Sequence, residues 1–218
     1  MKSPLKSLSH YCRGLCAALL LFVPLAGAGA AAPVPANLTQ QDLLDLQRIA
    51  LYLNNIRTMS GRYQQAASNG ASTGRMWVAR PGRMRFEYDP PNPITLLADT
   101  FYLYYWDRQL GQVSKVGLKS TPAWFLLRDP ISFSDVIVTH VDHGPNAIRI
   151  SVVESAEPDA GSLTMLFSEN PLALRQWTVV DQQGKTTTVS LSELQFGMPL
   201  DPKLFQYQDP FAGSHREN

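Results

Sequence analysis

The chain has 218 residues, of which 44% are hydrophobic and 17% are charged, and its formal net charge is +1. The charged fraction lies below the roughly 25% usual for soluble domains, and the near balance of acids and bases excludes a strong overall field that would recruit nucleic acid. The apolar content is sufficient for a core, which argues against disorder. Both cysteines, Cys12 and Cys16, lie near the N-terminus, so neither a disulfide framework nor a cysteine-rich metal site is expected downstream.

Residues 1–32 have the features of a cleavable secretory signal peptide. Lys2, Lys6 and Arg13 precede the apolar run 15–25, and mostly small residues follow up to position 32. The alternative is an uncleaved anchor, which is less favoured because a bilayer-spanning helix needs about 20 apolar residues. Cleavage would leave residues 33–218 as one exported domain with 16 basic and 18 acidic residues. Neither cysteine follows the pattern that precedes lipid modification, so no lipid anchor is expected.

One amphipathic helix is expected at the start of the exported domain. Thr39 with Asp42 three residues later is typical of a helix N-terminus. Leucine and alanine then recur at helical spacing up to Leu53, and the pair Asn54-Asn55 is expected to end the helix.

After this helix the period of the pattern changes from 3.6 to 2, which predicts strands. Expected strands cover residues 59–65, 75–80, 83–88, 94–98, 101–106, 110–116, 136–141, 148–154, 162–167, 174–180 and 186–194. A loop is expected at 70–74, a proline-rich break at 89–93, and a short helix at 123–127, which Pro122 opens and Pro130 closes. Many short strands at this spacing predict a mainly β, single-domain antiparallel sheet or barrel.

Two patterns hint at catalysis or metal binding, and neither is convincing. Residues 70–74 match Gly-x-Ser-x-Gly, but a nucleophile elbow needs a buried strand before it and a helix after it. His140 and His143 would point to opposite faces of a strand, which favours an exposed pair over a metal site. We therefore predict no enzymatic activity, no catalytic residue, no metal and no cofactor.

A concave apolar face is predicted from side chains of shared parity on adjacent strands. Its members are Met76, Val78, Met84, Phe86 and Tyr88, joined by a Pro81-Gly82 turn. Leu103 and Tyr105 are candidates for the same face, although their strand is apolar on both sides and either facing is possible.

The short helix is expected to cover this face. Trp124, Phe125, Leu126 and Leu127 are apolar nearly all round and must be buried against another element. With the helix stripe of Leu46, Ala50 and Leu53, they are predicted to form a lid over an apolar cavity, because two helices cannot fill so large a sheet face.

The order of several short motifs resembles that of the LolA family of periplasmic outer-membrane lipoprotein carriers. The motifs are Met76-Trp77-Val78-Ala79-Arg80-Pro81-Gly82, Phe86-Glu87-Tyr88, Ala98-Asp99-Thr100, Leu103-Tyr104-Tyr105-Trp106-Asp107, Gln112-Val113, Thr121-Pro122-Ala123, Leu126-Leu127 and Trp177-Thr178-Val179-Val180-Asp181 with Gly184 and Thr186. The resemblance runs from about residue 40 to 205.

This resemblance implies an open, incomplete β-barrel whose mouth is covered by helices. It also implies a periplasmic, monomeric carrier that shields the acyl chains of lipoproteins. Its partners would be an inner-membrane ABC lipoprotein exporter and an outer-membrane lipoprotein acceptor, with no nucleic acid. The family's arginine of the Arg-Pro motif falls on Arg80, where it would act as a latch that holds the lid closed. One departure is Thr100, where the family often has glycine.

Other roles within the same fold remain open. A lipoprotein acceptor, or a combined carrier and acceptor, would use the same cavity. A periplasmic lipid-sensing regulator of this fold is a further alternative, although such regulators carry a second domain.

Overall fold

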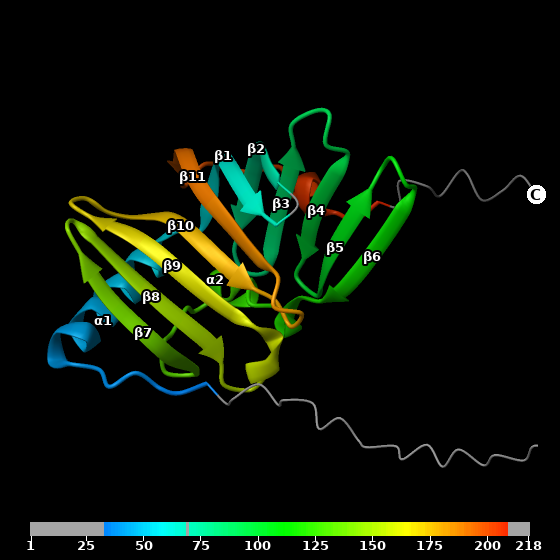
Figure 1. Cartoon of the computed structure of the whole chain (residues 1–218). Coiled ribbons are helices and arrows are strands. Elements are labelled where there is room, and N and C mark those ends of the chain that lie inside the picture. Colours follow the sequence, from blue (N-terminus) through cyan, green and yellow to red (C-terminus); the bar gives the residue numbers. More distant parts are fainter. Residues whose placement is uncertain (1–32, 69, 209–218) are drawn as a thin grey trace, which may run out of the picture. The chain divides into compact units, whose positions relative to one another are not determined.

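The computed structural model describes residues 33–68 and 70–208, so the predicted signal peptide lies outside the described residues (Figure 1). Helix α1 (Gln40–Asn55) is followed by strands β1 (Thr58–Ala67), β2 (Gly70–Ala79), β3 (Arg83–Tyr88), β4 (Ile94–Asp99), β5 (Tyr102–Asp107) and β6 (Gln112–Gly117). The 3₁₀ turn η1 (Leu118–Ser120) and the short helix α2 (Trp124–Leu127) come next. Strands β7 (Val136–Gly144), β8 (Ala147–Glu154), β9 (Ser162–Glu169), β10 (Leu172–Val180) and β11 (Thr186–Phe196) complete the sheet, with 3₁₀ turns η2 (Pro158–Ala160) and η3 (Pro202–Phe205).

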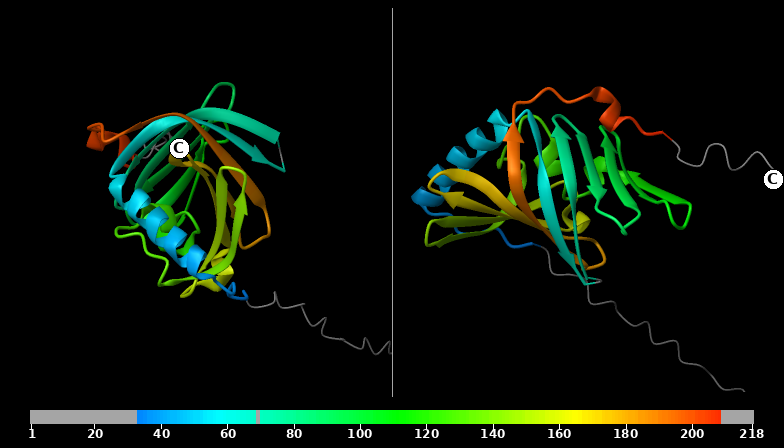
Figure 2. Two further views of the ribbon diagram at one scale, coloured as in Figure 1. Left: turned by 90° about the vertical axis from the view of Figure 1, so that its left-hand side faces the viewer. Right: turned by 90° about the horizontal axis from the view of Figure 1, so that it is seen from above.

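Eleven strands of the described chain form one sheet in the order β6-β5-β4-β3-β2-β1-β11-β10-β9-β8-β7. Every pairing is antiparallel, and the long strands β1 and β11 join the N-terminal and C-terminal halves at the centre. Strands β6 and β7 remain unpaired with each other, so the strongly curved sheet stays open (Figure 2). The predicted mainly β, open antiparallel barrel is confirmed.

Helix α1 begins at the predicted residue because its first turn is capped. The Thr39 side chain accepts a hydrogen bond from the Asp42 N–H at 3.2 Å, and the Asp42 carboxylate accepts one from the Thr39 N–H at 2.7 Å. The Thr39 hydroxyl also donates to the Asp42 carboxylate at 2.7 Å, and this bond, with the one from the Thr39 N–H, lowers the pKa of Asp42. The capping bonds satisfy donors that a helix terminus leaves free. The helix ends at Asn55, as the sequence predicts.

The buried side of α1 fills one half of the curved sheet (Figures 1 and 2). Leu46, Ile49 and Leu53 are buried in the core. The Tyr52 hydroxyl accepts a hydrogen bond from the Leu174 N–H at 3.1 Å, and its ring meets Phe167 edge-on at 6.2 Å. These contacts fix α1 against β9 and β10.

The loop predicted at residues 70–74 is wrong, because these residues belong to β2. Gly74 pairs with Tyr63 across the ladder to β1, and a Cβ at this position would lie 2.1 Å from the Glu87 carbonyl oxygen and 2.7 Å from the Tyr63 hydroxyl. The missing side chain of Gly74 therefore lets the strands approach closely. Glycine is also frequent in turns, which is why the sequence pattern suggested a loop here.

The outer face of β3–β5 is covered by the segment that follows β11. Phe205 is buried beneath the Arg83 guanidinium, which lies 5.8 Å from its ring centroid. The Tyr207 ring stacks on Tyr104 at 4.2 Å.

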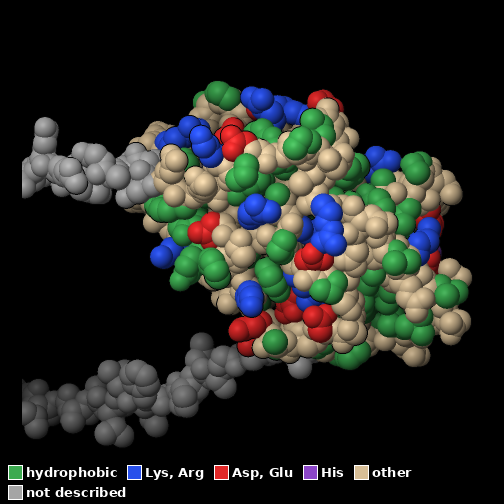
Figure 3. All heavy atoms as spheres, turned by 180° about the vertical axis from the view of Figure 1, so that it is seen from behind, with side chains coloured by type: hydrophobic (Ala, Val, Ile, Leu, Met, Phe, Trp, Pro, Cys, Tyr) green, Lys and Arg blue, Asp and Glu red, His purple; other side chains and the backbone are tan. Residues whose placement is uncertain are grey.

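Basic, acidic and hydrophobic side chains are intermixed on the face opposite the view of Figure 1, so no single-sign charge dominates that face (Figure 3).

Thr100 has a backbone conformation that disfavours threonine. Its φ is +91°, and its N–H donates to the Gly82 carbonyl at 2.8 Å, which brings two turns together. A β-branched residue with positive φ is strained, whereas glycine is not. Glycine, which the resemblance to the LolA family implies at this position, would relieve this strain.

We expect Thr100→Gly to raise the free energy of unfolding by about 1 kcal/mol. Relief of roughly 1–3 kcal/mol of backbone strain exceeds the roughly 0.5–1 kcal/mol by which glycine favours the unfolded chain. Urea denaturation measures the difference. Thr186→Gly, at the exposed start of β11, is the control and should lower the same quantity; equal destabilisation by both changes would show that Thr100 is not strained.

Candidate functional site

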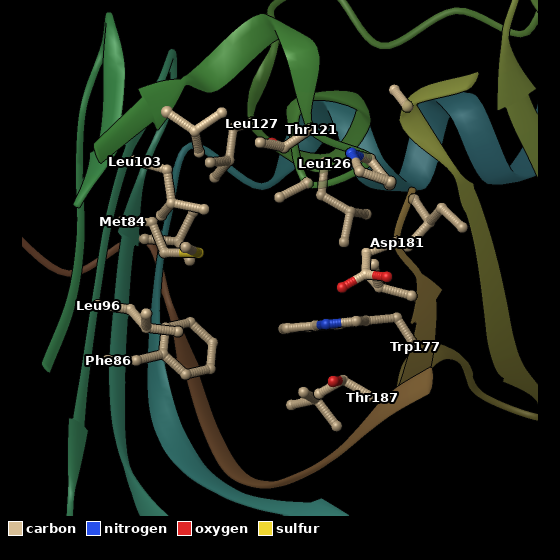
Figure 4. A pocket seen from close by; sticks show the side chains of 18 of the residues that line it. Met84, Phe86, Leu96, Leu103, Thr121, Leu126, Leu127, Trp177, Asp181 and Thr187 are labelled. Carbon is tan, nitrogen blue, oxygen red and sulfur yellow. The ribbon is translucent and has the colours of Figure 1, made fainter. Parts of the chain in front are cut away.

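A cavity of about 790 Å³ lies on the concave side of the sheet, beneath α2 (Figure 4). This volume is within the range of roughly 300–1,000 Å³ typical of ligand cavities. Met84, Phe86, Leu96 and Leu103 reach it from one side (Figure 4). Trp177 and Thr187 reach it from the other, so the cavity lies between β3–β5 and the central strands β10 and β11.

Six of the seven side chains predicted for the apolar face line this cavity: Val78, Met84, Phe86, Tyr88, Leu103 and Tyr105. The structure resolves the facing of β5, since Leu103 and Tyr105 are on the cavity side and Tyr104 stacks on Tyr207 on the outer side. Met76 does not line the cavity. It is completely buried in the core beside its ladder partner Phe86, whose larger ring reaches the cavity surface.

The far wall of the cavity was missed in the sequence analysis. Leu163, Leu174, Trp177 and Val189 line it from β9, β10 and β11. The Trp177 and Phe86 rings meet edge to face, with centroids 6.1 Å apart. A signal for these residues existed in the alternating pattern of β9, where Leu163 shares parity with buried positions two and four residues later.

Polar side chains are a minority of the lining, and some of them already have partners. The Tyr88 hydroxyl donates to Gln65 Oε1 at 2.6 Å, and burial raises the pKa of Tyr88, so it stays neutral. Asp181 sits at the β10–β11 turn, where its carboxylate accepts from the backbone N–H groups of Gln183 and Lys185, both at 2.9 Å. Such groups can orient a ligand at the rim, but the interior offers apolar contact.

The predicted lid residues differ in what they contact. Leu53, Leu126 and Leu127 line the cavity. Trp124 and Phe125 do not: the Lys119 ammonium lies 5.6 Å from the Trp124 ring centroid, and Phe125 is buried against Phe133.

Leu46 and Ala50 also do not line the cavity. Leu46 is in the packed core and Ala50 is half-buried, because this part of α1 lies over the filled half of the sheet. A lid role for these two residues has no support in the structure, and only the last turn of α1 takes part in covering the cavity.

Arg80 follows β2 directly and is buried among helix ends. Its Nε donates to the Ile56 carbonyl at 2.8 Å, Nη2 donates to the carbonyls of Leu53 and Ile56, and Nη1 donates to the Arg128 carbonyl at 3.4 Å. Burial lowers the pKa of Arg80, although an arginine remains charged at neutral pH. One guanidinium thus joins the C-terminal ends of α1 and α2.

Two further contacts hold the same region. The Gly82 N–H donates to the Leu127 carbonyl at 2.8 Å. The Asn54 side chain donates to the Ile131 carbonyl and accepts from the Ile131 N–H, both at 2.8 Å. Asn54 was expected only to end a helix, and nothing in the local sequence indicates its second role.

The loop after α2 begins at Arg128, whose side chain ties it to Asp135 and to β8. Its guanidinium donates to both carboxylate oxygens of Asp135 at 2.8 and 3.0 Å, to Glu154 at 3.3 Å, and to the Ser132 carbonyl. Burial raises the pKa of Glu154, and the Arg128 charge acts against that rise. The segment after α2 is therefore attached firmly on the side of β8.

His140 and His143 are both exposed, as predicted for a surface pair. His143 Nε2 lies 3.1 Å from Asp45 Oδ2, which connects β7 to α1. Within the described ranges, no group of three or more His, Cys, Asp or Glu side chains could hold a metal ion.

A curved sheet around a lidded apolar cavity is the geometry of a protein that shelters apolar groups from water. The sequence matches the family described as outer membrane lipoprotein carrier protein LolA over residues 54–208. It is 30% identical over 168 residues to an outer-membrane lipoprotein carrier protein of Legionella pneumophila (strain Paris), covering 72% of this chain and 82% of the relative. A protein of the same name from Pseudomonas aeruginosa (strain UCBPP-PA14) is 25% identical over 179 residues, with 78% and 86% covered. The chain belongs to the LolA family.

Among solved structures, a LolA superfamily protein from Nitrosomonas europaea shares 7% identity with a TM-score of 0.42, covering 74% of this chain and 97% of that one. The sequence matches, rather than this similarity, support a lipoprotein carrier role. In residues 33–68 and 70–208, no helix is long and apolar enough to cross a membrane.

We expect Asn54→Ala to loosen the loop after α2. The change removes two hydrogen bonds worth roughly 0.5–1.5 kcal/mol each, so amide exchange at residues 127–131 should become at least about five-fold faster. Hydrogen exchange measured by mass spectrometry reports this rate. Asn55→Ala is the matched control, because Asn55 is exposed on the same helical turn. Equal acceleration by both changes would show that the hydrogen bonds between Asn54 and Ile131 do not hold the loop.

Proposed function

We propose that this protein is a periplasmic carrier that shelters the acyl chains of lipoproteins between an inner-membrane ABC exporter and an outer-membrane acceptor. The observation that carries the proposal is the lidded apolar cavity in a member of a lipoprotein carrier family. In this role the protein binds and releases its cargo and catalyses no reaction. A cleaved signal peptide at residues 1–32 would place it in the periplasm.

The energetics of acyl chains explain why such a carrier needs a cavity. Each CH₂ group exposed to water costs about 0.8 kcal/mol, so one long chain costs on the order of 10 kcal/mol. A lipid-modified protein therefore leaves one membrane for another only slowly without shelter. Lining residues such as Met84, Phe86 and Trp177 supply apolar surface that replaces the membrane interior.

The contacts of Arg80 suggest how the cavity is kept closed when it is empty. Hydrogen bonds from a charged group are worth roughly 1.5–3 kcal/mol, which favours a closed lid about 10- to 150-fold. An entering acyl chain would displace the end of α1 and α2, and the guanidinium would lose its carbonyl partners. Re-forming these bonds would help to expel the cargo at the acceptor.

Leu103→Asp tests the cavity as the acyl site. Leu103 is half-buried in the lining, so a charge there opposes acyl binding with less risk to folding than at the nearly fully buried Phe86. We expect capture of a triacylated lipopeptide, measured by co-elution with the purified protein, to weaken by about ten-fold or more. Phe101→Asp, at an exposed aromatic residue outside the cavity lining, should capture the lipopeptide as the parent does. Unchanged capture by a folded Leu103→Asp protein would exclude the cavity as the binding site.

Arg80→Leu tests the latch. The change removes the bonds to the helix ends and adds apolar surface, so capture should stay at least equal while transfer to the acceptor falls by about ten-fold or more. Arg80→Lys should be intermediate, because an ammonium cannot reach several carbonyls in the way that a guanidinium does. Transfer from loaded carrier to acceptor is measured separately from capture. If Arg80→Leu releases cargo at the parental rate, Arg80 has only a structural role.

A further inference from the structure

The two free edges of the sheet differ in how they are covered. At the β7 edge the segment before α1 lies alongside the strand, and the Ala36 N–H donates to the Val138 carbonyl at 2.8 Å. At the β6 edge no backbone hydrogen bond from another described segment reaches Val113, Lys115 or Gly117. An exposed row of backbone donors and acceptors is a template for another strand.

The register of the β5–β6 ladder identifies which backbone groups of β6 are free. Leu118 N–H donates to the Phe101 carbonyl at 2.8 Å, so this opposed pair is hydrogen-bonded. Because bonded and non-bonded pairs alternate in an antiparallel ladder, Val116 and Ser114 also bond to β5. The N–H and C=O groups of Val113, Lys115 and Gly117 therefore point away from the sheet.

The inward side of this free strand is part of the cavity wall. Ser114 and Val116 line the cavity from β6, and Tyr105 lines it from β5. Val116 is 46% exposed and Tyr105 is 45% exposed, which places both at the mouth. A ligand whose apolar part occupies the cavity and whose chain leaves at this mouth would pass directly along the β6 edge.

From this geometry we infer that the β6 edge binds the polypeptide of the cargo, next to its acylated end, as an added antiparallel or parallel strand. The inference rests on the proposed carrier function. Strand addition relies on main-chain hydrogen bonds, so it accepts peptides of differing sequence. Val116, which is on the strand beside the added one, then offers apolar contact to a facing side chain of the added strand.

Charge at the centre of β6 disfavours the competing occupant, a second copy of this chain. Lys115 is the middle of the three residues with free backbone groups. Two β6 strands paired antiparallel about this residue would place two lysines directly opposite each other, which is destabilising. Its ammonium lies 4.5 Å from the Tyr102 ring centroid on the outer side, so the side chain does not obstruct the edge itself.

The test compares two synthetic ligands with the same triacylated cysteine. One ends in an amide at the cysteine, and the other continues with six residues of alternating serine and threonine. The parent protein should bind the longer ligand about ten-fold or more tightly, from the added backbone bonds. Lys115→Pro removes a free N–H without breaking the ladder to β5 and should abolish this difference, while Lys115→Ala should retain it.

Each outcome distinguishes the two proposals. If the parent binds neither ligand, the carrier function itself fails. If it binds both equally, or if Lys115→Pro keeps the difference, only strand addition is overturned. Unchanged binding of the short ligand shows that the Lys115→Pro protein is folded. If this variant does not fold, the parent protein is tested instead with a longer ligand that is N-methylated at alternate residues. Undiminished affinity of the parent for the methylated ligand would contradict the inference. A parent dimer in analytical ultracentrifugation that Lys115→Pro abolishes would assign the edge to self-pairing.

Discussion

In this structure one buried positive charge holds together the ends of two helices. The last carbonyls of a helix have no partner within the helix and carry partial negative charge. Arg80 supplies donors to such carbonyls from α1 and α2 at once, at Leu53, Ile56 and Arg128. Burial disfavours the charge, and the carbonyls compensate for it, so neither side of the contact is stable alone. Movement of one helix end therefore affects the other.

The sheet also explains why the cavity lies in one half of its concave side. Helix α1 fills the concave surface over β8–β10 with Leu46 and Ile49 and is fixed there by the Tyr52 hydroxyl. Among the helices of the described residues, α2 and the last turn of α1 cover the other half, and they are too short to fill it. The open sheet lets the two halves differ, because no closure forces a uniform radius.

Much of the fold follows from the period of the sequence, and the exceptions have physical causes. Strand β3 has its predicted bounds because a strand that is buried on one side must alternate. Residues 70–74 were misassigned because glycine is favoured both in turns and where a strand approaches an aromatic ring, here that of Tyr63. Local sequence also cannot reveal Asn54, whose partner Ile131 is 77 residues away. The alternating pattern placed Met76 on the correct face of β2. It could not show that the neighbouring Phe86 ring would line the cavity in place of Met76.

The length of α2 determines what opening the cavity means physically. Four residues form a single helical turn, and such a turn is not stable by itself because its nucleation cost is not repaid by further hydrogen bonds. Its shape is supported from outside by Gly82 and Arg80, and at its own C-cap by Arg128, which Asp135 holds in place. If these contacts were lost, the segment would unfold rather than move as a rigid body. Such opening would gain conformational entropy, so the balance between empty and loaded protein would shift with temperature.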